Sequence, residues 1–413
     1  MYCWEKSVIN LKSEHIKNEP FTSEQNKQTM GEYIIANYFI DKLRYLSLTQ
    51  NYLGPRILIT GSPSIGEREF CHTLINYSLK LGYTPLFCDL DLENEISVPG
   101  SISACIVDDL VPNDFLFDNA ISFFTGSTFS KINESMNWPL YEMQLVELGH
   151  ICIEKLEQDC MAWKKKMNII NENKENKISY ISPPKPTLFA SGLIVNCPMI
   201  EIDEQGKNIY KTIIENYKIT SIYVIENEKL KNVFKNMIKK DISLELISRL
   251  AGNESDKYEE IKRQKKITKY FKGPFNNFGL KQIKLDLNEY KFIKIIPSNI
   301  SSSMVPIGSS ADLKMVLKTF TKDDDEEELL KKLVCFVYLE EKDIKELDKE
   351  FDKDPNRYLE KFAKATVSYY GFITLFDKKN SKVTICCPFD EPQHKYILVG
   401  NIKYDNNKKD ISF

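Results

Sequence analysis

The chain has 413 residues, 42% of them hydrophobic, which is enough for two or three domains with a core each. Its net charge of −3 argues against a protein that holds nucleic acid mainly by charge, so any RNA contact requires a local patch or a partner. The ten cysteines form no C-x-x-C pair and the four histidines show no ligand spacing, which argues against a metal site and fits reduced thiols in an intracellular protein.

The N-terminal part of the chain does not show the pattern of a signal peptide. The first residues lack the apolar stretch of a signal peptide, and no apolar run approaches the roughly 20 residues of a membrane span. Residues 1–30 are polar and without periodicity, which predicts a loosely attached tail. Residues 33–43 have the apolar spacing of a helix, and Gly54-Pro55 ends that segment.

The next segments alternate between strand and helix patterns. Residues 56–60 and 86–90 are short apolar runs suited to buried parallel strands, and residues 70–81 between them have helical spacing. Together they predict one βαβ unit. Further along, the patterns predict two helices at 140–167 and 206–217, two strands at 192–196 and 221–225, and a polar loop at 171–177.

The character of the sequence changes after Pro297. Short β-type runs separated by charged turns occur at 333–339, 370–376, 382–386 and 396–400. An acidic block at 323–328 indicates a solvated loop or a helix start. We therefore predict a P-loop domain over 31–297, with a lid at about 226–273, and a smaller, mostly β domain over 298–413.

A degenerate phosphate loop follows the first predicted strand. A Walker A loop has the pattern G-x-x-x-x-G-K-[ST] between a strand and a helix. Both glycines are present at this spacing in the right context, but an acidic and a basic residue stand where the lysine and the hydroxyl residue belong. The candidate nucleotide-binding residues are Gly61, Ser62, Pro63, Ser64, Ile65, Gly66, Glu67, Arg68 and Glu69.

The two changed positions work against Mg-nucleotide binding. Glu67 replaces an attraction to phosphate, worth about 4 kcal/mol at about 4 Å and an effective dielectric of about 20, by a repulsion. Changing the attraction to a repulsion alters the interaction energy by up to about 8 kcal/mol. Even when solvent halves this change, the remaining energy of about 4 kcal/mol corresponds to nearly a thousandfold in affinity. Arg68 offers no acceptor and cannot ligate magnesium. The alternative is an ordinary strand-to-helix turn that never bound phosphate.

Several further segments occur in a characteristic order and spacing. They are Gly54-Pro55-Arg56, Leu74-Ile75-Asn76-Tyr77, the stretch from Leu90-Asp91 to Gly100, Gly126-Ser127-Thr128, Tyr270-Phe271-Lys272-Gly273, Val305-Pro306-Ile307-Gly308 and Tyr370-Gly371-Phe372-Ile373. From about residue 31 onward, the chain thereby resembles the polynucleotide 5′-hydroxyl-kinase family. The resemblance is greatest to the eukaryotic branch that contains the pre-mRNA cleavage complex II subunit, and less to the ribosomal-RNA-processing branch.

The resemblance implies a fold and a location. It implies a central α/β P-loop NTPase domain, with a mostly parallel sheet and helices on both faces, followed by the β-rich C-terminal domain. The family's N-terminal β domain, which holds the nucleotide base, is largely missing, and a truncated gene model would be an alternative cause. A nuclear protein is expected, with other cleavage-factor subunits as partners and with pre-mRNA bound directly or through them.

The resemblance also assigns the active-site positions. It places the metal or base aspartate at Asp91, substrate-side residues at Ser127 and Thr128, and the two lid arginines at positions that are here Glu254 and Glu259. The family uses ATP and magnesium, and acidic residues at these lysine and arginine positions imply that both bind weakly or not at all. An arginine that acts on the transition state is worth about 10³–10⁵ in rate.

We therefore expect a scaffold subunit of the pre-mRNA 3′-end cleavage and polyadenylation machinery, without catalysis or with weak nucleotide binding. The alternative is an active ATP-dependent kinase of 5′-hydroxyl RNA ends. The basic run at 262–269 either contacts RNA phosphates or is a solvated helix face.

Overall fold

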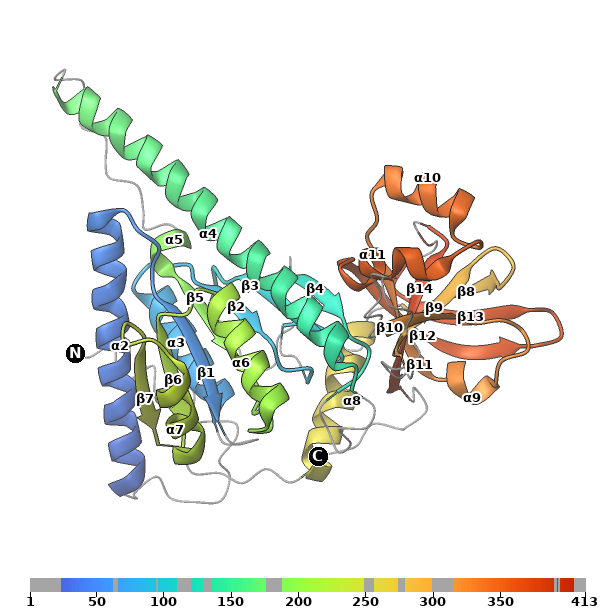
Figure 1. Ribbon diagram of the computed structural model, residues 1–413, viewed down its shortest axis with the longest axis horizontal. Coiled ribbons are helices and arrows are strands. Elements are labelled where there is room, and N and C mark those ends of the chain that lie inside the picture. Colours follow the sequence, from blue (N-terminus) through green and yellow to red (C-terminus); the bar gives the residue numbers. More distant parts are fainter. Residues whose placement is uncertain are drawn as a thin grey trace, which may run out of the picture.

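The computed structural model describes residues 24–61, 66–93, 96–109, 120–128, 136–175, 188–248, 256–273, 279–298, 315–389, 392 and 394–404. They form two units that lie side by side, each built on a seven-stranded sheet (Figure 1). None of the described helices has the length and apolarity that a membrane crossing requires.

The first sheet is mostly parallel, as the sequence predicts. Its order is β4-β3-β2-β5-β1-β6-β7; the five strands from β2 to β7 are parallel, and β3 and β4 add an antiparallel edge. The strands are β1 Arg56–Gly61, β2 Leu86–Asp89, β3 Ser101–Ile106, β4 Ile121–Phe124, β5 Leu193–Asn196, β6 Ser221–Ile225 and β7 Ser243–Ile247.

Helices cover both faces of this sheet, because side chains alternate along each strand. In β1, Ile57 and Ile59 pack with helices α2 and α3, whereas Leu58 packs with α4, α6 and α7. The helices are α2 Glu24–Gln50, α3 Glu67–Lys80, α4 Trp138–Glu175, the short α5 Leu188–Ser191, α6 Glu204–Asn216 and α7 Glu228–Met237. The α/β class with helices on both faces is confirmed.

The second unit is mostly β, and its sheet has the order β10-β9-β14-β11-β12-β13-β8. All neighbours in it are antiparallel except β9 and β14. Its strands are β8 Lys281–Asp286, β9 Lys291–Pro297, β10 Met315–Thr319, β11 Lys332–Val337, β12 Val367–Asp377, β13 Lys382–Cys387 and β14 Tyr396–Lys403. Its helices are α9 Glu326–Leu329, α10 Glu341–Glu350, α11 Leu359–Ala363 and a 3₁₀ turn at Pro355–Tyr358.

Several elements differ from the sequence expectations. Strands β8 and β9 belong to the second sheet, although the predicted boundary at 297/298 assigned them to the first domain; β8 is an edge strand whose exposed polar residues hide its period. Helix α2 begins at Glu24, inside the predicted tail, and α4 continues through 171–175, part of the predicted loop. The predicted lid segment contains β7, a strand of the first sheet.

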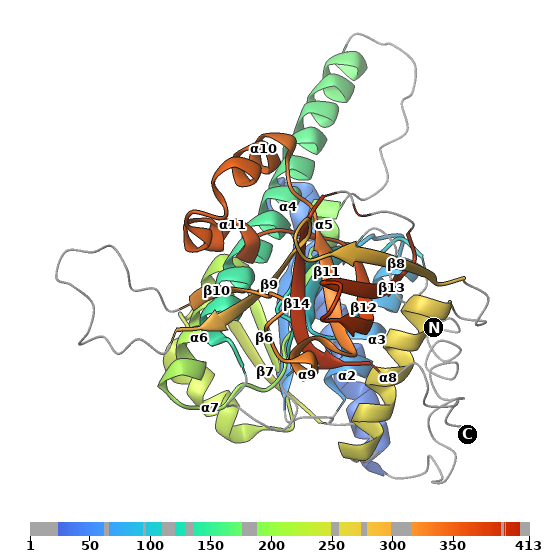
Figure 2. The same cartoon turned by 90° about the vertical axis from the view of Figure 1, so that its right-hand side faces the viewer.

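Helix α8, Asp256–Lys272, joins the two units (Figure 2). Ile267 and Phe271 are buried in one cluster with Phe124 of β4 and Phe372 of β12. Beside it, the Tyr370 hydroxyl lies 2.9 Å from Ser97 Oγ and 2.7 Å from Ser101 Oγ. The second unit is therefore packed on the first through apolar and polar contacts alike.

Phe271→Ala should destabilise the protein by about 3–5 kcal/mol, because it removes a side chain that is 1% exposed from the core between the units. Urea unfolding of the full chain measures this effect. Tyr38→Ala on α2 removes a comparable ring that is 67% exposed, and it should change the unfolding free energy by less than about 0.5 kcal/mol. Equal effects of the two substitutions would contradict the described packing.

Candidate functional site

The local backbone requires a glycine at both ends of the degenerate phosphate loop. Gly61 ends β1, and a Cβ there would lie 2.7 Å from Ile225 Cβ. Gly66 precedes α3 with φ +102°, a conformation that favours glycine. Ser62, Pro63, Ser64 and Ile65 lie outside the described residues. The strand, the turn position and the helix thus stand in the order that a phosphate loop requires.

Acidic side chains occupy the first turn of α3. Glu67 is the first residue of the helix and is buried, with 8% of its surface exposed, and Glu69 follows in the same turn. Carboxylates at this end interact favourably with the helix dipole and stabilise the helix by about 0.3–1 kcal/mol each. The same charges repel a phosphate group at this helix end, and burial weakens the solvent screening of that repulsion.

Arg68, at the position of the family's hydroxyl residue, is ion-paired with Asp91. Its Nη2 lies 2.7 Å from Asp91 Oδ2, and the two side chains are 18% and 15% exposed. The other carboxylate oxygen, Oδ1, accepts the backbone N–H of Glu93 at 3.0 Å. Both oxygens of Asp91 therefore have protein donors, and the charge that would attract a metal ion is already neutralised by a guanidinium.

A buried aspartate also holds the backbone of the loop after β2. Asp89 ends β2 with no exposed surface, and its Oδ1 accepts from the Asp91 backbone N–H at 3.1 Å and from Asn196 Nδ2 at 2.8 Å. Asp89 and Asn196 are register partners on neighbouring parallel strands β2 and β5. The sequence analysis did not identify either residue as part of a site, although an acidic residue that ends a buried strand is a signal for one.

The third carboxylate of this segment, Glu93, is held by the lid helix. Arg263 of α8 donates from Nε to Glu93 Oε2 at 2.9 Å and to Oε1 at 3.1 Å, and its Nη2 also contacts Oε1. The two side chains are 11% and 10% exposed. Burial raises the pKa of Glu93, and the hydrogen bonds and charge of Arg263 oppose that rise. Lys266 Nζ adds a bond of 3.0 Å to the Glu93 carbonyl oxygen.

This geometry changes the expectations for the lid. Glu254 lies outside the described residues, and Glu259 lies in α8, where only its backbone is described. Besides Arg68, two cations of the basic run at 262–269 reach the loop after β2, namely Arg263 and Lys266 of α8. The run is therefore not a wholly solvated helix face, and contact of its other lysines with RNA stays a prediction.

The substrate-side residues lie in the loop after β4. Ser127 is buried and its Oγ donates to Met136 Sδ at 3.5 Å, while Thr128 is partly exposed. Within the described residues, no group of three His, Cys, Asp or Glu side chains has an arrangement that could hold a metal ion. The structure brings Glu67, Arg68 and Asp91 together at the carboxyl end of the parallel strands, where α/β sheets bind ligands.

Comparisons with known proteins agree with this architecture. The family model described as the mRNA cleavage and polyadenylation factor CLP1 P-loop matches residues 61–173 and 172–273. The model described as the pre-mRNA cleavage complex II protein Clp1 matches residues 281–406. The second match begins with β8, as the second sheet does.

Individual relatives are distant in sequence. A protein CLP1 homolog of Anopheles gambiae is 22% identical over 306 residues, which cover 72% of this chain and 64% of that protein. The mRNA cleavage and polyadenylation factor CLP1 of Debaryomyces hansenii is 23% identical over 427 residues, which cover 97% and 77%. A solved complex of Clp1p with Pcf11p superposes with a TM-score of 0.67 at 20% identity, over 91% of this chain and 80% of that one.

The pair between Arg263 and Glu93 generates a stability prediction. Arg263→Gln should destabilise the full chain by about 3–5 kcal/mol, because it leaves the Glu93 carboxylate buried without its cation. Urea unfolding measures this, and limited proteolysis should show earlier cleavage in α8. Arg357→Gln, which removes a 61% exposed cation paired with Glu350, should cost less than about 1 kcal/mol. Indistinguishable variants would show that Arg263 does not hold the lid.

Proposed function

The chain belongs to the family of the mRNA cleavage and polyadenylation factor CLP1, and from that premise we propose that it is a scaffold subunit of the pre-mRNA 3′-end cleavage machinery that does not transfer phosphate. The family models match most of the chain, and both sheets of the fold are present. Because pre-mRNA is processed in the nucleus, we propose a nuclear location as well.

The ion pair between Arg68 and Asp91 carries the non-catalytic part of this proposal. In a P-loop enzyme the magnesium ion is held by a hydroxyl residue of the loop and by an acidic residue. Here a guanidinium stands at the hydroxyl position and donates to the acidic residue, so the protein supplies the positive charge itself. A cation that has no lone pair to offer cannot hold magnesium.

The residues present do not fit Mg-ATP. Glu67 at the lysine position is buried, so little solvent separates its charge from a phosphate at the helix end. One related solved structure is described by the structural basis for ATP loss in a point mutant, so a single substitution removed the nucleotide from that protein. This chain departs from the phosphate-loop pattern at two consecutive positions, Glu67 and Arg68.

A Pcf11-type subunit is the partner that we propose. The two related solved structures named as complexes contain Clp1p together with Pcf11p, and their fold matches this chain over 91% of its length. A scaffold needs a stable fold rather than a working active site, and Asp89, Asp91 and Glu93 have protein partners without a nucleotide.

The proposal that the chain does not transfer phosphate is tested by an assay with a short RNA that has a 5′-hydroxyl end. The assay measures transfer of labelled phosphate from ATP to this RNA in the presence of magnesium. The wild-type chain should give no product above the level of its Asp91→Ala variant, because Asp91 is already bound by Arg68. Turnover that Asp91→Ala abolishes would establish the alternative, an active polynucleotide kinase. Asp377→Ala in an exposed turn of the second unit is a matched control for loss of an aspartate.

Calorimetry with ATP and magnesium tests nucleotide binding separately. The wild-type chain should bind weakly, and the double variant Glu67→Lys/Arg68→Ser should bind up to about a thousandfold more tightly, the equivalent of about 4 kcal/mol. Tight binding by the wild-type chain would contradict the proposal, because it would show that backbone N–H groups of the loop hold the nucleotide without the lysine.

Co-purification with a Pcf11-type subunit tests the partner. The two chains, expressed together, should elute as one complex at micromolar concentration in buffer without ATP, because protein groups already hold the carboxylates after β2 and no nucleotide is needed to order the site. Separate elution, or a complex that forms only when ATP is added, would contradict the proposal. The Arg263→Gln variant shows whether the closed lid contributes.

A further inference from the structure

Four lysines form a row across one face of the second sheet. The row runs over the adjacent strands β10, β9, β14 and β11 and consists of Lys318, Lys294, Lys403 and Lys332. Lys318 is the register partner of Lys294, and Lys332 is the register partner of Lys403. Like charges directly opposite each other destabilise a sheet, so two such pairs side by side require a compensating reason.

All four lysines are on the same face because side chains alternate along a strand. The second unit has a core cluster of its own on one face of its sheet, which contains Phe292 and Phe320. Lys294 lies two residues after Phe292, and Lys318 lies two residues before Phe320. Lys332 stands two residues from Val334, a member of the same cluster. Lys403 follows Val399 and Asn401 along β14 on this side, whereas Ile402 and Tyr404 pack into the core between the units.

Among the described residues, only one of the four lysines is in a direct ion pair, although the charge of Glu328 also acts on Lys294 and Lys332. Lys318 Nζ lies 2.6 Å from Glu328 Oε2 and 3.2 Å from Asp324 Oδ1. In the described part of the chain, Lys294, Lys332 and Lys403 have no carboxylate within ion-pair distance; Lys332 donates to the Asn401 carbonyl oxygen at 2.8 Å. Two carboxylates of the acidic block at 323–328, Asp324 and Glu328, thus contact a row of four lysines, and the surplus of positive charge lies at Lys294, Lys332 and Lys403.

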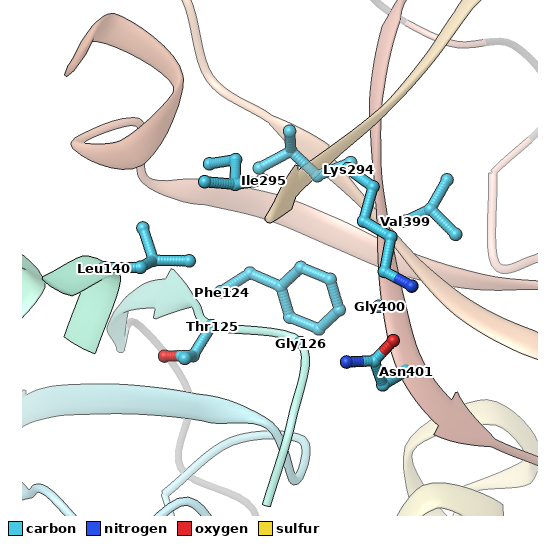
Figure 3. A pocket seen from close by; sticks show the side chains of 10 residues that line it. Phe124, Thr125, Gly126, Leu140, Lys294, Ile295, Val399, Gly400 and Asn401 are labelled. Carbon is cyan, nitrogen blue, oxygen red and sulfur yellow. The ribbon is translucent and has the colours of Figure 1, made fainter. Parts of the chain in front are cut away.

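A small pocket lies beside the row, at the junction of the two units. The second unit contributes Lys294 and Asn401 to it, and the first contributes Thr125 and Gly126. Figure 3 shows the Lys294 ammonium and the Asn401 amide near each other at one end of this pocket, next to Gly400. The Asn401 backbone N–H donates to the Gly126 carbonyl oxygen at 2.6 Å, which fixes the two units at this point.

Burial and mutual repulsion act on these ammonium groups. Burial lowers the pKa of Lys332 to about 8, and the charges of Lys294 and Lys403 add to that effect while Glu328 opposes it. Burial also lowers the pKa of Lys294; Glu328 opposes this and Lys318 adds to it. An anion bound between them would relieve the repulsion and favour the charged forms.

We propose that this lysine row, together with Asn401, binds the phosphate backbone of single-stranded RNA without sequence preference, at a place separate from the degenerate nucleotide site. The choice of RNA rests on the proposed function. The residue type fits a flexible phosphate backbone: a lysine binds phosphate as a point charge, and a row without arginine lacks the fork that fixes the orientation of one bound phosphate or carboxylate.

Binding of a fluorescent oligouridine of about ten nucleotides to the full chain, followed by anisotropy at several salt concentrations without ATP, tests the proposal. The variant Lys294→Gln/Lys332→Gln should lower the slope of log affinity against log salt by about 1.4, since each lost phosphate contact removes about 0.7. Between 50 and 200 mM salt, a fourfold change, this corresponds to about sevenfold in relative affinity.

The matched control is Lys345→Gln/Lys349→Gln, which removes the same net charge from two exposed positions on α10. It should leave the affinity and the slope as in the wild-type chain. Equal behaviour of the two double variants, or no RNA binding by the wild-type chain, would overturn the proposal. Because the assay contains no ATP, these outcomes are independent of the phosphate-transfer result.

Two further measurements identify the ligand. Inorganic phosphate should compete only at concentrations far above those of the RNA, and polyglutamate that displaces the RNA at equal charge would overturn the choice of a phosphate backbone. Affinity should rise as the pH falls from about 9 to about 7, because Lys332 changes from about one tenth to about nine tenths charged over that range. This pH dependence should disappear in Lys294→Gln/Lys332→Gln, and its persistence there would contradict the assignment.

Discussion

Three carboxylates at alternate positions, from the last residue of β2 onward, constrain the rest of the structure. Asp89, Asp91 and Glu93 all lie at the carboxyl end of the first sheet, and a buried charge without a partner is costly. In a kinase, a metal ion can compensate such a charge. In this chain the compensating groups are the Asn196 amide and the guanidiniums of Arg68 and Arg263. Protein groups alone therefore compensate these three carboxylates.

That completion extends to the relative position of the two units. Arg263 can reach Glu93 only when α8 lies against the loop after β2, and the same helix buries Phe271 between the units. The ion pair and the apolar contact favour one arrangement, in which the lid helix is in place without a bound nucleotide. In kinases, closure of such segments by substrate completes the active site. Here the closed arrangement is available from the protein's own contacts, which suits a rigid scaffold.

Local patterns in the sequence were enough to predict the fold class, because the buried strand at 56–60 and the glycine turn after it depend on near neighbours. The features that could not be predicted depend on distant neighbours. Arg263 meets Glu93 across 170 residues, and the assignment of the lid positions to Glu254 and Glu259 stays a prediction. The edge strand β8 lacks a clear period because most of its residues are exposed. The lysine row could not be found from the sequence, since it depends on the register of four strands that are far apart in the chain.

The positions of the charges separate two functions that a kinase of this fold would combine. Phosphoryl transfer requires positive charge near the phosphate loop, and there the cations Arg68 and Arg263 are bound to carboxylates. Backbone binding requires surplus positive charge that a phosphate can reach, and in the lysine row Lys403 is exposed, Lys294 and Lys332 are partly exposed, and all three lack carboxylate partners within the described chain. Replacing Glu67 by lysine would therefore not by itself restore a metal site, because Asp91 would stay bound to Arg68. The proposed absence of phosphate transfer and the proposed binding of RNA on the second sheet therefore rest on two separate groups of charged residues.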